Sequence, residues 1–557
     1  MSRLAVAMDL GTSGFRAQAV DLASGEALST AITLRHPLPG ANVIDHLHFA
    51  LEQGVEAARD LVIHAVNQVI EQLRIHVDEV VRLAVCGNPT QLSLFQGMEI
   101  RDLAFAGSRK LQAMHVVAPE RGAATRAAAE FPGLALPDKC VVIIPPAVRD
   151  EVGADALALI LQSGMLNCDE TTIAIDYGTN AEMALAHEGV IYTGSAAAGP
   201  ALEGQHIRCG MLANPGAVSD LGPVGEEHRL FVLDAQMQPA EGALIDLRQA
   251  VETDAATGPR ARGITGTGVI AAIDQALAAG MIDLPRITTD DRLLHLGKHL
   301  YLTEADVAEA GKAVGAIRAG YFTLCVEAGI APADIRTAIL AGASGTYMDA
   351  RKAGRLGLIP PGTRSVRQIG NTSLAMARQL AQTPETLHEM SDLARQLRQS
   401  HCMFALSRTF AFVYLLELSL WSEGMPVSKY REILSRRRLP DMPPMDAAPH
   451  TCSRVERDIA DYGTMGLSTL ARIGKIVALP VDGCIGCMTC VRECPAEAIS
   501  IRTDTEPPTL VLEHALCNGM ACRRCEPCCS EKVFHLNAFF AAASDCDLKT
   551  AGVPLRN

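Results

Sequence analysis

The sequence has no long apolar segment that is free of charge. A helix that crosses a bilayer needs about 20 consecutive, mostly apolar residues. The segment of this 557-residue chain that comes nearest, residues 403–421, is interrupted by Arg408 and Glu417. We therefore expect a protein that has no membrane partner.

Positive charge is also in short supply. The chain has 49 Lys and Arg residues against 63 Asp and Glu residues, which gives a formal net charge of −14. Because proteins bind nucleic acid phosphates through a basic face, this balance argues against a nucleic acid partner. The short arginine run at residues 436–438 is typical of a solvated linker.

Two further sequence signals are missing. The first residues, MSRLAVAMDLG, contain no apolar core of a secretory signal peptide. This favours the reducing cytoplasm, where disulfides are rare. No segment matches the P-loop pattern GxxxxGKS/T, so any nucleotide site must be built from other elements.

Cysteine, by contrast, is abundant, and ten of the 17 cysteines follow residue 480. Four of them form the run C-x2-C-x2-C-x3-C, with Pro495 directly after it: Cys484, Cys487, Cys490 and Cys494. In bacterial ferredoxins, three thiolates of such a run bind one [4Fe–4S] cluster and the fourth binds a neighbouring cluster. A second cluster therefore requires a second run.

That second run has the spacings x4, x2 and x3, and its members are Cys517, Cys522, Cys525 and Cys529. We expect two [4Fe–4S] clusters, with Cys494 serving the cluster of the second run and Cys529 that of the first. Cys528 remains an alternative ligand, and we choose Cys529 because it repeats the x3 spacing. Structural zinc, which usually takes separated CxxC pairs, fits these spacings less well.

Three glycine-containing elements elsewhere in the chain predict a phosphate site. The first, DLGTSG between two apolar strands, offers glycine backbone, two hydroxyl groups and a carboxylate that can hold a cation. Its residues are Asp9, Gly11, Thr12 and Ser13. The second repeats this hairpin 167 positions later, with Asp176, Gly178, Thr179 and Asn180. Two copies predict a duplicated fold that grips nucleotide phosphates from both sides.

The third element runs from the strand RTAILAG into the start of a helix, ASGTYMDA. Glycine there permits close approach of the backbone to a ligand. The residues expected to line the nucleotide pocket are Gly342, Ser344 and Gly345.

Such hairpin phosphate loops resemble those of the ATPase superfamily that contains actin, Hsp70 and sugar kinases. An ordered set of segments resembles, more narrowly, the reductive activators of corrinoid-dependent methyltransferases. The C-terminal position of the ferredoxin run is similar to that in the activases of methylamine methyltransferase corrinoid proteins. The segments are GNPTQLSLF (87–95), IPPAVRDEVGADALALIL (144–161), IDYGTNAEMAL (175–185), AAAGPALEGQHIRCGM (197–211), RGITGTGVIAAIDQAL (262–277), AIRAGYFTLCVEAGI (316–330), LAGASGTYMDARKAGRLGLIP (340–360) and IGNTSLAMAR (369–378).

The resemblance implies an α/β fold: a duplicated actin/Hsp70-like ATPase with ribonuclease H-like lobes, followed by an α+β ferredoxin-like domain for two [4Fe–4S] clusters. Within the second lobe, Thr303 with the acidic residues after it predicts the start of a long helix. Within the linker, the proline-rich stretch is expected to be followed by a helix around residues 454–474. The expected limits are residues 1–165 and 166–430 for the lobes, 431–475 for the linker, 476–545 for the ferredoxin domain and 546–557 for a tail.

The resemblance also implies a function. The protein would use ATP and Mg²⁺ to return the cobalt of a methyltransferase corrinoid protein from Co(II) to Co(I), with electrons from a low-potential donor passing through the clusters. Asp9 would hold Mg²⁺, directly or through water, and Asp176 would orient the attacking water or the metal. Two alternatives stay open: an ATP-driven electron donor to another low-potential enzyme, of the dehydratase or aryl-CoA reductase activator type, and an iron–sulfur redox sensor that is not an enzyme.

Overall fold

The computed structural model describes residues 3–40, 42–105, 108–149, 151–235, 237–250, 258–443, 449–520 and 522–544. The predicted tail, 546–557, lies outside these residues. The chain forms two compact units, the first from residues 1–150, 376–391 and 461–557 and the second from residues 151–375 and 392–460. Two of the unit boundaries therefore fall inside helices, one in α11 (Thr372–Gln382) and one in α12 (Thr386–Leu397).

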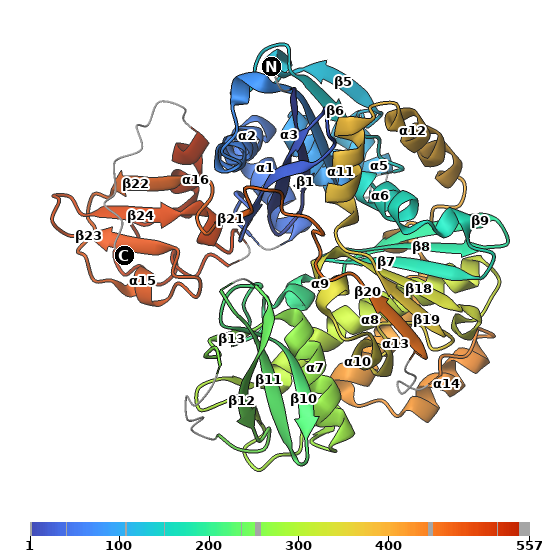
Figure 1. Cartoon of the computed structure of the whole chain (residues 1–557). Coiled ribbons are helices and arrows are strands. Elements are labelled where there is room, and N and C mark those ends of the chain that lie inside the picture. The colour runs from blue at the N-terminus through green and yellow to red at the C-terminus, as the bar shows by residue number, and fades with distance from the viewer. Residues whose placement is uncertain are drawn as a thin grey trace. The chain divides into compact units, whose positions relative to one another are not determined.

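A seven-stranded sheet forms the centre of the first unit (Figure 1). Strands β1, β2 and β3 are antiparallel, whereas β4 runs parallel to β1 and β6 parallel to β4. Every residue of β1 is buried, as the unbroken apolar segment before Asp9 requires. The order across the sheet is β21 (Leu467–Leu470), β3 (Ala27–Thr33), β2 (Phe15–Asp21), β1 (Leu4–Leu10), β4 (Val80–Gly87), β6 (Val141–Ile144) and β5 (Ala124–Ala127).

The main helices of this unit alternate with the strands along the chain. Helix α2 carries a continuous buried face that packs on β2 and β3. The helices are α1 (Val43–Gln53), α2 (Val55–Gln72), α3 (Pro89–Gln96), α4 (Arg101–Ala104) and α5 (Ser108–Ala113).

The second unit repeats the same strand pattern. Strands β7, β8 and β9 are antiparallel, while β18 runs parallel to β7 and β19 parallel to β18. The order is β20 (Thr451–Arg454), β19 (Ser365–Gln368), β18 (Thr337–Ala341), β7 (Thr172–Tyr177), β8 (Ala181–His187) and β9 (Val190–Ala196). Strands β9-β8-β7-β18-β19 thus match β3-β2-β1-β4-β6, which confirms the predicted duplication.

Further elements surround this second sheet. A four-stranded sheet has the order β12 (Pro239–Ile245), β11 (Glu227–Leu233), β10 (Ala217–Val224) and β13 (Gly263–Ile264). Two short hairpins are β14 (Ile282–Asp283) with β15 (Arg286–Ile287), and β16 (Leu294–His295) with β17 (Tyr301–Leu302). The helices are α6 (Ala154–Ser163), α7 (Gly266–Ala278), α8 (Glu304–Glu327), α9 (Gly342–Tyr347), α10 (Ala350–Arg355), α13 (Arg408–Glu423) and α14 (Val427–Arg436).

Helix α8 begins where the sequence predicts. The Thr303 hydroxyl accepts a hydrogen bond from the Asp306 amide, and the Asp306 carboxylate accepts one from the Thr303 amide. This reciprocal cap satisfies two of the free donors at the helix start. The prediction for this segment is confirmed.

The residues from 476 onward form a small α+β region within the first unit. Its sheet has the order β22 (Ile476–Pro480), β24 (Thr509–Glu513) and β23 (Ile499–Arg502), and its helices are α15 (Thr489–Arg492) and α16 (Leu536–Ser544). Helix α16 packs against α2 and α1, and the ring of Phe540 lies 5.3 Å from that of Phe49 on α1. The cysteine-rich region is therefore fastened to the first sheet and its helices.

The helix predicted around residues 454–474 is wrong. Among the described residues of 449–475, the structure has strands only: β20 extends the second sheet beside β19, and β21 extends the first sheet beside β3. Gly463 and Gly466 have φ values of 82° and 78°, and such left-handed residues break a helix. Pairing with two sheet edges therefore outweighs the local helical pattern.

None of the helices in the described part of the chain combines the length and the apolarity that crossing a bilayer demands.

Candidate functional site

The first hairpin lies between β1 and β2, at the carboxyl end of β1. A side chain is excluded at Gly11 and Gly14, because a Cβ there would lie 2.8 Å from the Gly14 oxygen and 2.6 Å from the Thr33 hydroxyl, respectively. Asp9 is 6% exposed and pairs in register with Arg16 on β2, whose Nη1 lies 3.6 Å from Asp9 Oδ2. The predicted residues Asp9, Gly11, Thr12 and Ser13 thus share one tight, glycine-built turn.

Asn88 is a residue of this site that the sequence prediction missed. Its Nδ2 donates to the Thr12 hydroxyl at 3.0 Å, and its Oδ1 accepts from the Gln91 amide as the cap of α3. Asn88 lies in the segment 87–95, which resembles the corrinoid activators, but the resemblance implied no role for this residue. The signal was an asparagine directly after a buried strand and before a Pro-initiated helix.

The second hairpin joins β7 to β8 and has its own supporting contacts. The Gly178 amide donates to the Asn180 oxygen at 3.2 Å, and the Thr179 hydroxyl donates to Glu203 Oε2 at 2.8 Å. Glu203 ends the short helical turn at residues 200–203. It is a second residue that sequence reasoning missed, because its role depends on a contact across 24 positions of the chain.

The third element meets the second hairpin at the end of the sheet. Strand β18 pairs with β7 so that Ala341 lies opposite Asp176. Gly342 follows with φ of 77°, and its amide donates to the Gly370 oxygen at 3.0 Å. A Cβ on Gly342 would lie 2.3 Å from Asp176 Oδ1, so the backbone there can pass the carboxylate only as glycine.

The two other predicted residues of this element are held by neighbouring groups. The Ser344 hydroxyl donates to the Leu202 oxygen at 3.0 Å. A Cβ on Gly345 would lie 3.2 Å from the ring of Tyr177, which indicates close packing of α9 on β7. The second unit thus brings Asp176 and Gly342 together.

A further carboxyl group lies beside Asp176. Glu182 pairs with Asp176 in the β7–β8 register, is 6% exposed and accepts a hydrogen bond from the Ser195 hydroxyl at 3.3 Å. Burial, together with the charges of Asp155 and Asp176, raises the pKa of Glu182 well above its usual range. Such a shift favours the neutral carboxyl group at Glu182, and sequence reasoning did not identify this residue.

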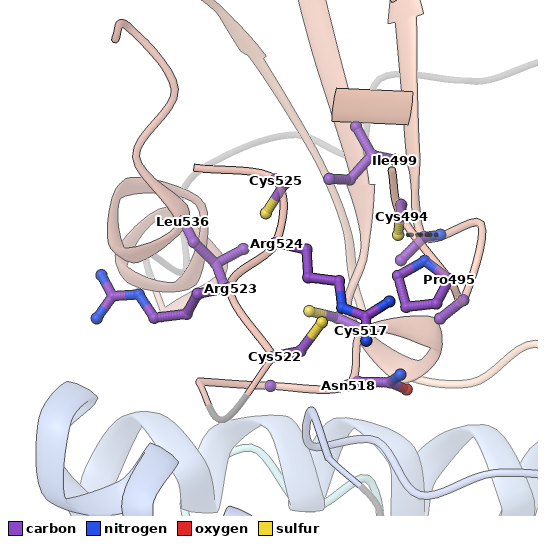
Figure 2. A pocket seen from close by; sticks show the side chains of 13 residues that line it. Cys494, Pro495, Ile499, Cys517, Asn518, Cys522, Arg523, Arg524, Cys525 and Leu536 are labelled. Atoms are coloured by element: carbon purple, nitrogen blue, oxygen red, sulfur yellow. Dashed lines mark hydrogen bonds between the residues drawn. The ribbon is translucent and has the colours of Figure 1, made fainter. Parts of the chain in front are cut away.

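The cysteines of the C-terminal region form two groups. One group lines a pocket together with Pro495 and Arg524 (Figure 2). The figure shows the sulfur atoms of Cys517 and Cys522 pointing toward one another. The four members of this group, three from the second run and one from the first, are Cys494, Cys517, Cys522 and Cys525.

The other group contains the rest of the first run and one cysteine of the second. Burial and then the nearby thiols of Cys528, Cys484 and Cys487 raise the pKa of Cys490 to about 11. Burial, and then the charges of Glu493, Cys529 and Cys487, raise the pKa of Cys528. The electrostatic influence of Cys528 on Cys490 places it near the first run, whereas the spacing argument selected Cys529.

These two groups fit the ferredoxin arrangement, because each combines three cysteines of one run with one cysteine of the other run. No three His, Cys, Asp or Glu side chains within the described ranges are close enough to hold a single metal ion.

Two family models match the chain. One, described as the C-terminal domain of RACo, the ASKHA domain, covers residues 170–431, and the other, the RACo middle region, covers residues 4–167. ASKHA denotes the actin-like and sugar-kinase-like ATPase fold, which agrees with the repeated sheets.

Named relatives are similar over much of the chain. A [Co(II) methylated amine-specific corrinoid protein] reductase of Methanosarcina barkeri is 46% identical over 89% of this chain and 92% of its own length. The corrinoid activation enzyme RamQ of Eubacterium limosum is 26% identical over 66% of this chain and 62% of its own length.

A solved structure agrees with these relatives. A reductive activator for a corrinoid, iron-sulfur protein superposes with a TM-score of 0.60 and 26% identity, over 75% of this chain and 66% of that one. The repeated sheets, both phosphate hairpins and the high identity to the archaeal reductase lead to one conclusion. The chain belongs to the family of reductive activators of corrinoid proteins.

Proposed function

We propose that this protein carries out the ATP-dependent reductive activation of a corrinoid protein of a methyltransferase system. The substrate is the cobalt of that partner, which gains one electron and passes from Co(II) to Co(I). The observation that carries this proposal is the presence, in one chain of this family, of two phosphate hairpins and two groups of four cysteines.

The chain's own residues divide into two sets of tasks. Asp9 holds Mg²⁺, directly or through water, while Asp176, next to the buried Glu182, orients the attacking water or the metal. The remaining predicted residues offer hydroxyl, amide or backbone N–H groups to the nucleotide: Gly11, Thr12, Ser13, Gly178, Thr179, Asn180, Gly342, Ser344 and Gly345.

The cysteines hold two [4Fe–4S] clusters, which supply one-electron transfer at low potential when bound. One set consists of Cys484, Cys487, Cys490 and Cys528, and the other of Cys494, Cys517, Cys522 and Cys525. The first set is the more open to solvent, since Cys487 is exposed and Ile485 is 66% exposed. We therefore assign electron exchange with partners to this side. Retention of thiolate-bound clusters suits the reducing cytoplasm.

Nucleotide is useful here because the acceptor can lie below the donor in potential. For one electron, about 59 mV corresponds to a tenfold ratio, so a gap of about 200 mV is worth roughly 5 kcal/mol. Binding energy that differs between two conformations can supply such an amount. An electron carrier without an ATPase lacks this source of free energy.

The test mixes the reduced holoprotein, Mg-ATP and a Co(II) corrinoid protein encoded nearby, and follows the absorbance of Co(I). Asp9→Ala should abolish ATP turnover and Co(I) formation while leaving the iron content, about eight atoms per chain for two cubes, unchanged. If Asp9→Ala forms Co(I) at the wild-type rate with ATP present, ATP is not coupled to the electron transfer. An iron content of about two per chain would remove the two-cluster part of the proposal.

A further inference from the structure

The first phosphate hairpin is connected to helix α3 by a side chain. Asn88 donates to the Thr12 hydroxyl at 3.0 Å and accepts the Gln91 amide at 3.0 Å. A change in the position of Thr12 therefore acts directly on the first turn of α3. Thr12 is one of the residues to which we assign phosphate contact.

Gln91, on that first turn, lies between two buried histidines. Its Oε1 is 2.9 Å from His36 Nε2, and its Nε2 is 2.9 Å from His46 Nδ1. Gln91 is 1% exposed, His36 is 4% exposed and His46 is fully buried. The imidazole rings of His36 and His46 stack, with their centroids 3.9 Å apart. Gln91 is the only hydrogen-bonded bridge that the described contacts show between α3 and both rings.

The direction of these hydrogen bonds is fixed. Burial lowers the pKa of His36 to about 3, and burial followed by the His36 charge lowers the pKa of His46 well below its usual range, so both rings are neutral. His36 Nδ1 accepts from the Leu38 amide at 3.1 Å, so its Nε2 must donate to Gln91 Oε1. The Gln91 amide then donates to His46, whose Nε2 is left buried with no partner in the described structure.

The far end of this network reaches the second cysteine group. The segment that follows His36 continues through Leu38 to Gly40, whose amide donates to the oxygen of Cys517 at 2.9 Å. Gly519 also approaches Gly40 closely, since a Cβ on Gly519 would lie 3.4 Å from the Gly40 nitrogen. Cys517 is thus tied through its backbone to the residues that Gln91 orients.

We propose that Gln91 is a positioning residue that transmits the state of the Thr12 phosphate hairpin, through His36 and the segment 38–40, to the loop that carries Cys517. This inference rests on the proposed function and deepens it, because it names the route by which nucleotide acts on the second cysteine group. Each step is a hydrogen bond or a short covalent segment within the first unit, and none needs a charged group to be buried.

The hydrogen-bond network of Gln91, His36 and His46 has features of a structural element that can adopt two arrangements. His46 Nε2–H is a buried donor without an acceptor in the described structure, and such a donor favours any arrangement that supplies an acceptor. The edge of Phe15, the first residue after the hairpin, also contacts His36 at 5.2 Å between ring centroids. Movement of the hairpin therefore reaches His36 by two routes.

The experiment compares the wild-type holoprotein with Gln91→Met, which keeps the side-chain length but removes both hydrogen bonds. Gln96→Met is the matched control, since Gln96 lies on the same helix and bonds only to the Leu92 oxygen of α3. Amide hydrogen exchange of the peptides 36–46 and 514–520 is measured with and without saturating Mg-ATP analogue. Nucleotide binding and iron content are measured separately.

We expect nucleotide to change the exchange rate of both peptides by about fivefold or more in the wild type and in Gln96→Met. In Gln91→Met this response should be lost, although nucleotide still binds and the iron content is unchanged. If Gln91→Met fails to fold, Asn88→Ser removes the contact with Thr12, because the shorter side chain does not reach that hydroxyl, while the serine hydroxyl keeps the α3 cap. This variant should lose the response as well.

A full nucleotide response in Gln91→Met or in Asn88→Ser would overturn the inference. So would a wild-type protein that binds nucleotide and forms Co(I) but shows no change in either peptide, and in that case the proposed function would stand. A wild-type protein that binds no nucleotide would overturn both.

Discussion

A Cβ atom placed on Gly342 would lie 2.3 Å from Oδ1 of Asp176. The two residues stand at the ends of neighbouring parallel strands, and Gly342 also has a φ of 77°. Two separate constraints, space and backbone conformation, therefore require glycine where the third nucleotide element passes the second hairpin.

We predict that Gly342→Ala loses ATP turnover by at least tenfold, because the new methyl group must displace the Asp176 carboxylate or the backbone of α9. The control is Gly329→Ala, at a φ of 72° with open space around the Cβ position. This control should lose only about 1 kcal/mol of stability, the cost of a left-handed alanine, with normal turnover. ATPase rates and thermal unfolding check both variants; equal turnover in the two would refute the spatial argument.

Substitution of the adjacent cysteines should separate the two candidate ligands of the first group. Cys528→Ser is expected to lose about four of eight iron atoms, or to show a changed cluster signal by electron paramagnetic resonance, because the Cys528 thiol is gathered with Cys490. Cys529→Ser should keep the wild-type iron content and spectrum. The reverse outcome would restore the assignment that follows from the x3 spacing.

The contrast between these cysteines shows where sequence reasoning ends. Patterns that depend on neighbours in the chain could be predicted from the sequence: both phosphate hairpins, the Thr303 cap of α8 and the two cysteine runs. Features that depend on contacts between distant segments could not be predicted. Glu203 reaches Thr179 only after the chain has folded back, and residues 451–454 and 467–470 become strands because two sheet edges are available to them.

Glu203 is predicted to support ATP turnover by holding Thr179. Its carboxylate accepts from the Thr179 hydroxyl at 2.8 Å, and a hydrogen bond to a charged group is worth about 1.5–3 kcal/mol. Glu203→Ala should therefore lower ATP turnover by about tenfold to a hundredfold, whereas Glu203→Gln, which keeps an acceptor, should lose less.

The control for this prediction is Glu170→Gln. Glu170 accepts a similar but longer hydrogen bond, 3.5 Å, from the hydroxyl of Thr337. Thr337 is the half-buried first residue of β18 and does not belong to a phosphate hairpin. Its turnover should equal that of the wild type. A Glu203→Ala protein with unchanged steady-state ATPase parameters would show that Thr179 needs no such support.

From the surroundings of His514 we predict how acid changes the stability of the cysteine-rich region. Its ring lies 5.2 Å from that of Phe540 and 6.4 Å from that of Phe49, and its Nε2 is 3.3 Å from the Phe539 oxygen. Burial lowers the pKa of His514 from 6.5 to about 4. Between these two values the unfolded chain binds a proton that the folded chain does not, so stability is complete above pH 6.5 and falls as the pH drops toward 4.

One pKa unit corresponds to 1.36 kcal/mol, so the loss from His514 alone should reach about 1.4 kcal/mol by pH 5.5. Amide exchange of β24 at pH 7.5 and 5.5, corrected for intrinsic rates, gives the opening free energies that measure this loss of stability. In His514→Phe, which keeps an aromatic ring against Phe49 and Phe540, the difference between the two pH values should shrink by that amount. The exposed His535→Gln should keep the wild-type difference, and an unchanged difference in His514→Phe would show that another group is responsible for the acid sensitivity.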